Sequence, residues 1–123
     1  MALDLARLTG SEARFGQELS AYERRRVEIA RAMVGQPRIV LMDEPGAGLS
    51  QAESEELQAI IKAIPDHYNA MVVLIDHDVS LIAATCTSTV VLDFGSLITH
   101  GPTEVVLRDD RVKAAYLGTE ELL

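Results

Sequence analysis

The sequence predicts an α/β fold built around two parallel strands. Two short apolar runs, at 39–42 and 70–75, are bounded by turn-forming or polar residues, which is typical of strands. The segment between them, 50–64, has apolar residues at helical spacing. A strand, a helix and a strand in this order form a βαβ unit with a parallel pair. Because neither run alternates apolar with polar residues, we expect both strands to be buried on both faces.

The first predicted strand ends in two carboxylates, Asp43 and Glu44. Successive strand side chains point to opposite faces, so the two acids diverge from one point. In open parallel sheets, ligands bind outside the carboxyl ends of the strands. Two acids there can hold a hydrated metal ion and orient a water, which suits phosphoryl transfer, with Asp43 as metal ligand and Glu44 as general base. The alternative is a strand that simply ends in solvent.

The second predicted strand is followed by Asp76, His77 and Asp78. Parallel strands end at the same sheet edge, so we expect His77 to lie beside Asp43 and Glu44. There its imidazole is suited to hydrogen-bond a terminal phosphate or the attacking water. A purely structural histidine is the alternative.

A long helix is predicted over 19–34. Ser20 followed by Glu23 fits a capping box, and Gly35 with Pro37 marks the end. The predicted apolar stripe comprises Val27, Ala30, Val34 and the neighbouring Met33. The run Arg24, Arg25 and Arg26 is interpreted as a solvated face, with phosphate or an acidic partner as the alternative.

A second capping box, Ser50 with Glu53, opens the next helix, which we expect Pro65 to end. Its predicted stripe comprises Leu57, Ile60, Ile61 and Ile64. After the second strand, we expect a helix at 79–84 capped by Asp78, and then a hairpin of 89–94 with 96–100 joined near Gly95. A helix is expected at 104–107, followed by a last helix capped by Asp109 or Asp110. This last helix is expected to end at Gly118, before a frayed tail at 119–123, and its predicted inward residues are Val112, Ala115, Tyr116 and Leu117.

Composition narrows the class of protein. The 123 residues suffice for one domain, and 19 acids against 11 bases argue against non-specific nucleic-acid binding. A single cysteine, Cys86, excludes an internal disulfide and favours a reducing compartment. The longest apolar run is far shorter than the ~20 residues that span a bilayer, and the N-terminus lacks the pattern of a signal peptide. We therefore expect a cytoplasmic protein.

The sequence lacks the phosphate-binding half of a nucleotide site. It contains neither Gly-x-x-x-x-Gly-Lys-[Ser/Thr] nor Gly-x-Gly-x-x-Gly, and its two lysines, Lys62 and Lys113, do not follow glycine-rich turns. A nucleotide enzyme needs backbone N–H groups and a lysine around the phosphates. Zinc spacing and a Gly-x-Ser-x-Gly elbow are also missing from the sequence.

Four motifs in order resemble those of the ATP-binding subunits of ABC transporters, over nearly the whole chain. Residues 19–23, Leu-Ser-Ala-Tyr-Glu, resemble the signature Leu-Ser-Gly-Gly-Gln; 39–44 resembles the Walker B strand with its catalytic glutamate; 46–50 resembles the D-loop; and His77 resembles the switch histidine. The end of the chain, 101–118, is similar to the tail of branched-chain amino acid transporter subunits.

The resemblance implies a partial RecA-like (P-loop NTPase) α/β fold, with a parallel sheet flanked by helices, then a C-terminal β-hairpin and helices. Residues 1–123 would form the C-terminal half of an ABC ATP-binding domain. Residues 1–36 would be a remnant of the helical subdomain with the signature helix. Residues 37–123 would carry the Walker B strand, D-loop, switch histidine and tail.

The same resemblance assigns roles. It implies that Asp43 holds Mg²⁺ through water, Glu44 polarises the attacking water and His77 contacts the γ-phosphate. The D-loop residues would be Gly48, Leu49 and Ser50. Signature residues would serve the ATP bound on the opposite subunit: Ser20, Ala21, Tyr22 and Glu23. Two such subunits sandwich two ATP molecules and drive a membrane permease, which places them at the cytoplasmic side of the inner membrane.

Three differences from the family's motifs limit which of these roles the resemblance implies for this chain. The family's Walker A loop, adenine-stacking aromatic and glutamine loop are missing; Ala21 and Tyr22 replace signature glycines; and Ser50 replaces a D-loop Asp or Asn. We therefore expect this chain alone to bind no ATP or Mg²⁺ and to hydrolyse none. Tyr22 is expected to obstruct the close approach of phosphate that glycine permits.

Three functions are consistent with these features. The leading one is the C-terminal half of the ATP-binding subunit of an ABC importer for branched-chain amino acids. The second is a non-enzymatic fragment that self-associates or pairs with an N-terminal half, because a half-domain leaves sheet edges and apolar surface open. The third is a fragment of a soluble ABC ATPase of DNA maintenance, which the transporter-like tail and the net charge of −8 disfavour.

Overall fold

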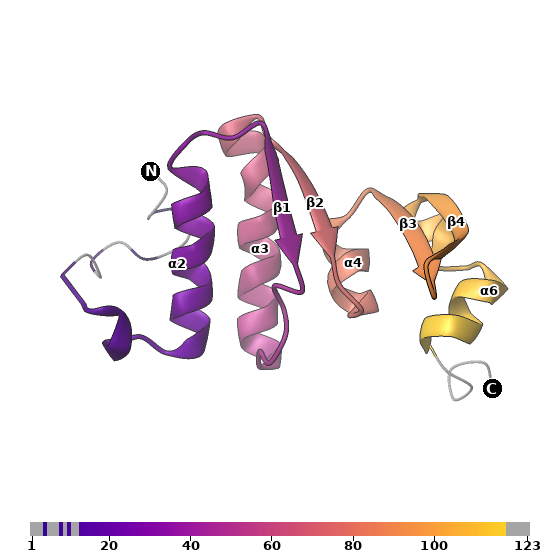
Figure 1. The fold of residues 1–123 in the computed structure, drawn as a ribbon, viewed down its shortest axis with the longest axis horizontal. Coiled ribbons are helices and arrows are strands. Elements are labelled where there is room, and N and C mark those ends of the chain that lie inside the picture. Colours follow the sequence, from indigo (N-terminus) through magenta and orange to yellow (C-terminus); the bar gives the residue numbers. More distant parts are fainter. Residues whose placement is uncertain (1–3, 5–7, 9, 11–12, 118–123) are drawn as a thin grey trace. The chain divides into compact units, whose positions relative to one another are not determined.

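A computed structural model describes residues 4, 8, 10 and 13–117. The chain divides into two compact units, 1–75 and 76–123, which are considered separately (Figure 1). The predicted end at Gly118 and the predicted frayed tail, 119–123, lie outside the described residues.

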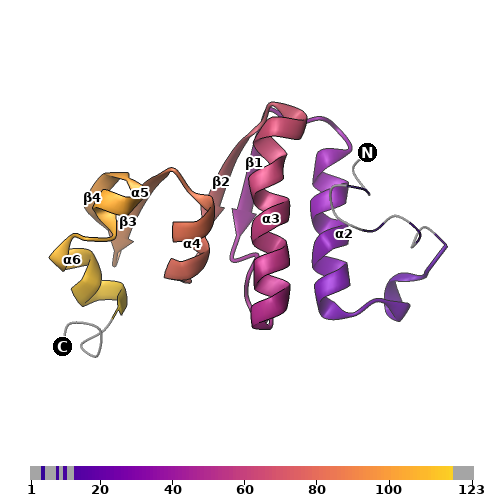
Figure 2. The ribbon, with the colours of Figure 1, turned by 180° about the vertical axis from the view of Figure 1, so that it is seen from behind.

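The first unit contains the predicted βαβ arrangement. Its elements are η1 (Gly16–Glu18), α2 (Ala21–Met33), β1 (Ile39–Asp43), α3 (Gln51–Tyr68) and β2 (Met71–Ile75). The two strands are parallel, with Ile39 opposite Met71 and Asp43 opposite Ile75. Seen from both sides, α3 lies against one face of this strand pair (Figure 1, Figure 2). The parallel pair expected from the sequence is therefore confirmed.

The prediction that both strands are buried on both faces is wrong. Along β1, Val40 and Met42 are buried, whereas Leu41 is 76% exposed. The exposed face of the pair, called the open face below, comprises Ile39, Leu41, Met71, Val73 and Ile75. The physical reason is that the helices of this unit cover one face, and strand side chains alternate between faces. An apolar run does not reveal whether its second face has a covering layer.

Helix α2 begins at the predicted capping box. The hydroxyl of Ser20 accepts the N–H of Glu23 at 3.1 Å, and the Glu23 carboxylate accepts the N–H of Ser20 at 3.1 Å. The buried residues of the helix are Tyr22, Ile29, Ala30 and Met33. The predicted stripe is thus partly wrong, because Val27 and Val34 are exposed. The buried side of the helix is the side that carries Tyr22 in the first turn, and Val27 and Val34 do not lie on that side.

Helix α3 begins at the second capping box, with Ser50 and Glu53 bonded reciprocally at 2.9 and 3.2 Å. Its predicted stripe is confirmed, since Leu57, Ile60, Ile61 and Ile64 are buried. The predicted end at Pro65 is wrong, because the helix continues to Tyr68 and ends at Asn69 in the left-handed conformation, φ 50°. Proline removes only one backbone donor, and one lost bond near a helix end is tolerable where the preceding turn is anchored in the core.

The second unit contains α4 (Val79–Thr85), β3 (Ser88–Asp93), β4 (Ser96–Pro102), α5 (Thr103–Val106), α6 (Asp110–Val112) and a π-turn, η2 (Lys113–Leu117). The predicted hairpin is confirmed: β3 and β4 are antiparallel, with a register shift between Val91 and Leu92. Phe94 and Gly95 have φ of 47° and 79° in its turn, which matches the twist of the strands.

The core of the second unit is small. It comprises Val91, Val106 and Val112, with Ile98 and Leu107 packed against it. Burial of Val112 was predicted, but the inward positions predicted for Ala115 and Tyr116 are wrong, since both are exposed. The chain leaves the α-helical path at 113–117, so helical spacing no longer applies. The predicted inward side chain of Leu117 lies outside the described side chains.

Helix α6 supplies a pH-dependent contribution to stability. Asp109 accepts the N–H of Arg111 at 2.8 Å and pairs with its guanidinium at 2.8 Å. These bonds, the side-chain bond first, lower the pKa of Asp109 from 3.8 to about 2. A lowered folded-state pKa means that the stabilisation is present above pH 3.8 and is lost as pH falls through about 2. Asp109→Asn should therefore lower the melting temperature more at pH 7 than at pH 2, where Asp109 is already partly protonated, in thermal scans that include Asp110→Asn as the matched control. Equal effects of Asp109→Asn at both pH values would contradict this.

Candidate functional site

The acid pair lies at the carboxyl end of β1. Asp43 is the last strand residue, opposite Ile75, and Glu44 follows with its N–H donating to the Ile75 carbonyl at 2.6 Å. Both acidic side chains are exposed. The parallel pair thus presents two carboxylates at the sheet edge where the sequence predicted them.

The turn after the acid pair has a constrained backbone. Glu44 has a φ of 48°, and its carbonyl accepts the N–H of Ala47 at 3.2 Å. Of the predicted D-loop residues, Gly48 has a φ of 74°, which glycine adopts without steric cost. Leu49 is half-buried, with its N–H bonded to the Gly46 carbonyl at 3.3 Å, and Ser50 caps α3. These residues connect the acid pair directly to a helix start.

The predicted signature residues form the start of α2. Glu23 caps Ser20 and also binds Arg14 at 2.7 Å. The hydrogen bond from the Ser20 backbone, followed by that from Arg14, lowers the pKa of Glu23. An ionised carboxylate and a serine hydroxyl engaged as a cap therefore occupy this helix end, while Ala21 is exposed.

The position of Tyr22 does not support the expectation that its side chain obstructs the approach of phosphate. Its side chain is buried, with 6% of the residue exposed, and the guanidinium carbon of Arg26 lies 4.7 Å from its ring centroid. This geometry is that of a cation–π contact. The ring therefore packs inward, and the exposed end of the helix carries Ser20 and Ala21 instead.

His77 belongs to the second unit, two residues after the end of β2. Its side chain is exposed, and Nδ1 lies 3.8 Å from the carboxylate of Asp76, whose side chain is 2% exposed. Asp76 accepts the N–H of Asp78 at 2.9 Å, and Asp78 caps α4 as predicted. The placement of His77 beside Glu44 remains a prediction.

The described part of the chain supplies no complete metal site. Among these residues, no group of three or more histidine, cysteine, aspartate or glutamate side chains is arranged to hold an ion. Carboxylate oxygens are the ligand type that Mg²⁺ prefers, and Mg²⁺ usually keeps several waters and binds substrate phosphates besides one or two carboxylates. The acid pair fits that partial role. Nor does any helix in the described residues have the length and apolarity needed to cross a membrane.

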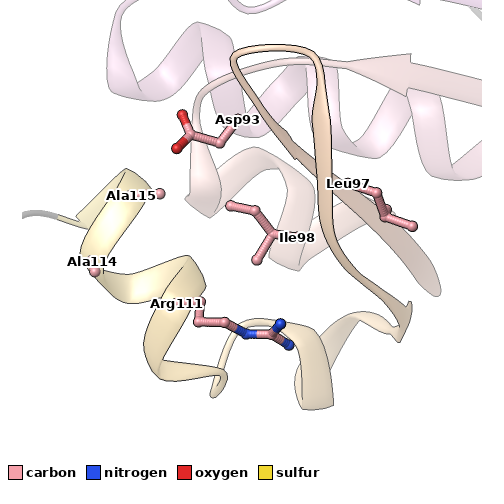
Figure 3. A pocket seen from close by; sticks show the side chains of 6 residues that line it. All are labelled: Asp93, Leu97, Ile98, Arg111, Ala114 and Ala115. Atoms are coloured by element: carbon pink, nitrogen blue, oxygen red, sulfur yellow. The ribbon is translucent and has the colours of Figure 1, made fainter.

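A shallow groove is present in the second unit (Figure 3). It is lined by Asp93, Leu97, Ile98, Arg111, Ala114 and Ala115. The guanidinium of Arg111 is already paired with Asp109. The groove contains none of the predicted site residues, so we assign it no cofactor.

Comparison with known proteins supports the resemblance found in the motifs. The family model for ABC transporters matches residues 2–47, which include the signature segment and β1. The lipopolysaccharide export system ATP-binding protein LptB of Escherichia coli K12 is 40% identical over 105 residues, covering 85% of this chain and 43% of the relative. The chain is similar in sequence to ATP-binding subunits of ABC transporters. A second ABC relative, the high-affinity branched-chain amino acid transport ATP-binding protein LivG of E. coli K12, is 37% identical over 105 residues, with 85% and 41% covered.

Solved ABC structures confirm the fold class. An ATP-binding cassette of an ABC transporter in its ADP conformation matches with a TM-score of 0.84 and 25% identity, over 95% of this chain and 47% of that chain. A nucleotide-free ABC cassette matches with a TM-score of 0.78 and 24% identity, over the same shares. The chain therefore spans less than half the length of the relatives and structures it matches.

Proposed function

We propose that this chain supplies the hydrolytic acid pair and the signature helix of an ATP-hydrolysing ABC cassette. Asp43 would hold Mg²⁺ through water, and Glu44 would polarise the water that attacks the γ-phosphate. When bound, Mg²⁺ neutralises phosphate charge. The observation that carries the proposal is the position of both acids at the carboxyl end of β1, in a parallel pair, on a chain similar in sequence to ABC ATP-binding subunits.

His77 is proposed as the third member of this site, in contact with the γ-phosphate. It follows Ile75 by two residues, so their Cα atoms lie at most ~7.6 Å apart. The Ile75 carbonyl in turn accepts the Glu44 N–H. Chain connectivity thus limits how far His77 lies from the acid pair, which supports a shared role.

The remaining roles concern a second subunit. The helix end formed by Ser20, Ala21, Tyr22 and Glu23 would face the ATP held by the opposite ABC subunit, with the buried ring of Tyr22 directed inward. Gly48, Leu49 and Ser50 would lie at the interface as its D-loop. The exposed positions of Ser20 and Ala21 favour this. The ionised carboxylate of Glu23 argues against this role in ATP binding, because a carboxylate repels phosphate at the same helix end.

The sequence contains no phosphate loop, so the ATP cradle must come from residues outside these 123. We expect no magnesium-dependent ATP turnover from the purified chain. Turnover should appear when the chain is mixed with the part of a LivG-type relative that it does not span. Robust hydrolysis by the chain alone, or a mixture that assembles with ATP bound but never hydrolyses it, would contradict the proposed function.

Import of branched-chain amino acids is the proposed transport process. The tail at 101–118 and the 37% identity to LivG support it, whereas the 40% identity to LptB supports lipopolysaccharide export as the alternative. The partners would be a second ABC subunit and a permease, which would hold the chain at the cytoplasmic side of the inner membrane. Co-purification with permease subunits of each type tests this, and retention by the lipopolysaccharide exporter alone would overturn the amino-acid assignment.

The open face supports a second candidate, a non-enzymatic fragment that binds a partner or a second copy. Five apolar residues lie exposed on one face of a two-stranded sheet. Sedimentation over a concentration series should show self-association, weakened by Leu41→Lys with Val73→Glu, which places opposite charges at paired positions. A strict monomer at all concentrations would exclude self-association.

A DNA-maintenance role is disfavoured by two transport relatives and a net charge of −8.

A further inference from the structure

We infer that Arg25 is a positioning residue that holds the backbone of Glu44. The importance of this role for catalysis rests on the proposed function of Glu44, whereas the contact between Arg25 and the backbone does not. Arg25 lies in the first turns of α2, and Glu44 follows β1, so the contact joins the signature helix to the turn that carries the acid.

The contact consists of two hydrogen bonds from one guanidinium nitrogen. Nη1 of Arg25 donates to the carbonyl of Glu44 at 3.4 Å and, more closely, to the carbonyl of Pro45. The Arg25 side chain is 27% exposed, and its Nε lies 3.8 Å from the exposed carboxylate of Glu28. A largely covered guanidinium thus holds two consecutive carbonyls of the turn.

Glu44 needs such support because its backbone is strained. Its φ of 48° lies in the left-handed region, which residues other than glycine rarely adopt. Proline at position 45 restricts the preceding residue further. A conformation of this kind persists only where its surroundings fix it. The Glu44 N–H donates to the Ile75 carbonyl, and the Glu44 carbonyl accepts the N–H of Ala47; Arg25 adds a hydrogen bond from α2 to the same carbonyl.

The three consecutive arginines have different contacts. Nε of Arg24 donates to the carbonyl of Gly16 at 3.1 Å, and the guanidinium of Arg26 lies over the Tyr22 ring. Interpreting 24–26 as a solvated face is therefore wrong for Arg25 and Arg26, which are half-buried. The hydrogen bonds of Arg25 reach the turn after β1, whereas Arg24 bonds the Gly16 carbonyl, which makes Arg24 a suitable control.

The consequence for the proposed site is geometric. The direction of the Glu44 carboxylate depends on its φ, and φ is held through the two carbonyls that Arg25 binds. A movement of the first turns of α2 would act on the backbone of Glu44 directly.

The test is the Arg25→Met variant of the chain, studied by NMR without nucleotide. The HN–Hα coupling of Glu44 reports its φ, and hydrogen exchange at Ala47 reports the bond to the Glu44 carbonyl. We expect a changed coupling and about tenfold lower protection of Ala47, since bonds from charged donors are lost. Arg24→Met should leave both unchanged, and Arg25→Lys should retain part of the protection.

A second variant separates positioning from a general loss of structure. Glycine accepts a positive φ without strain, so adding Glu44→Gly to Arg25→Met should restore most of the Ala47 protection. The inference is overturned if Arg25→Met leaves the Glu44 coupling and Ala47 protection as in wild type, or if the double variant loses as much protection as Arg25→Met. Because no ATP is used, these outcomes are independent of the turnover experiment.

Discussion

Replacing Glu44 by glutamine is expected to lower ATP turnover of the assembled cassette by about 10²- to 10⁴-fold. Glutamine has the size of glutamate but cannot accept a proton from the attacking water. The measurement is magnesium-dependent phosphate release from the chain mixed with the complementary part of an ABC relative. Glu55→Gln is the matched control, because Glu55 is an exposed acid on α3 that bonds Gln51 at 3.1 Å.

Binding of ATP by the same assembly should survive Glu44→Gln, since the phosphates are held by other groups in the proposed site. A variant that binds and hydrolyses ATP like wild type would remove Glu44 from the role of general base. A variant that loses binding and turnover together would instead assign Glu44 to nucleotide or metal binding.

Met42→Ala should destabilise the first unit by about 2–5 kcal/mol, whereas Leu41→Ala should change its stability by no more than about 0.5 kcal/mol. The two residues are adjacent in β1, but Met42 is 7% exposed and Leu41 is 76% exposed. Truncating Met42 leaves a cavity under the helices, while truncating Leu41 removes atoms that already contact water. Hydrogen exchange of amides in β1 and α3 reports this unit separately.

Equal costs at the two positions would show that the open face is covered in solution. Repeating the measurement at lower protein concentration would then show whether a second copy is the cover. In the assembled cassette, Leu41→Ala should become costly, because the complementary part is expected to bury this face.

Local signals predicted much of the fold. Both capping boxes formed at Ser20 and Ser50, since each needs only residues three apart. The strand–helix–strand order and the hairpin at Gly95 also follow from short-range patterns. The end of α3 was mispredicted because a buried anchor at Ile64 outweighs the one bond that Pro65 removes.

Features that depend on distant packing were not predictable in the same way. The sequence of β1 does not indicate whether another structural element packs over Leu41 on the open face. For the site, Asp43 and Glu44 were found because they follow a strand end directly. The contact of Arg25 spans 19 residues to Glu44, and nothing in the run of three arginines distinguishes the middle one.

The claim that the acid pair and His77 face one ATP site is tested most directly by cross-linking. Glu44→Cys and His77→Cys are combined with Cys86→Ser and treated with a short bismaleimide, with Glu55→Cys and His77→Cys as the control pair. The account predicts rapid intramolecular cross-linking of 44 to 77 and little of 55 to 77. Failure of 44 and 77 to cross-link above the control would contradict it.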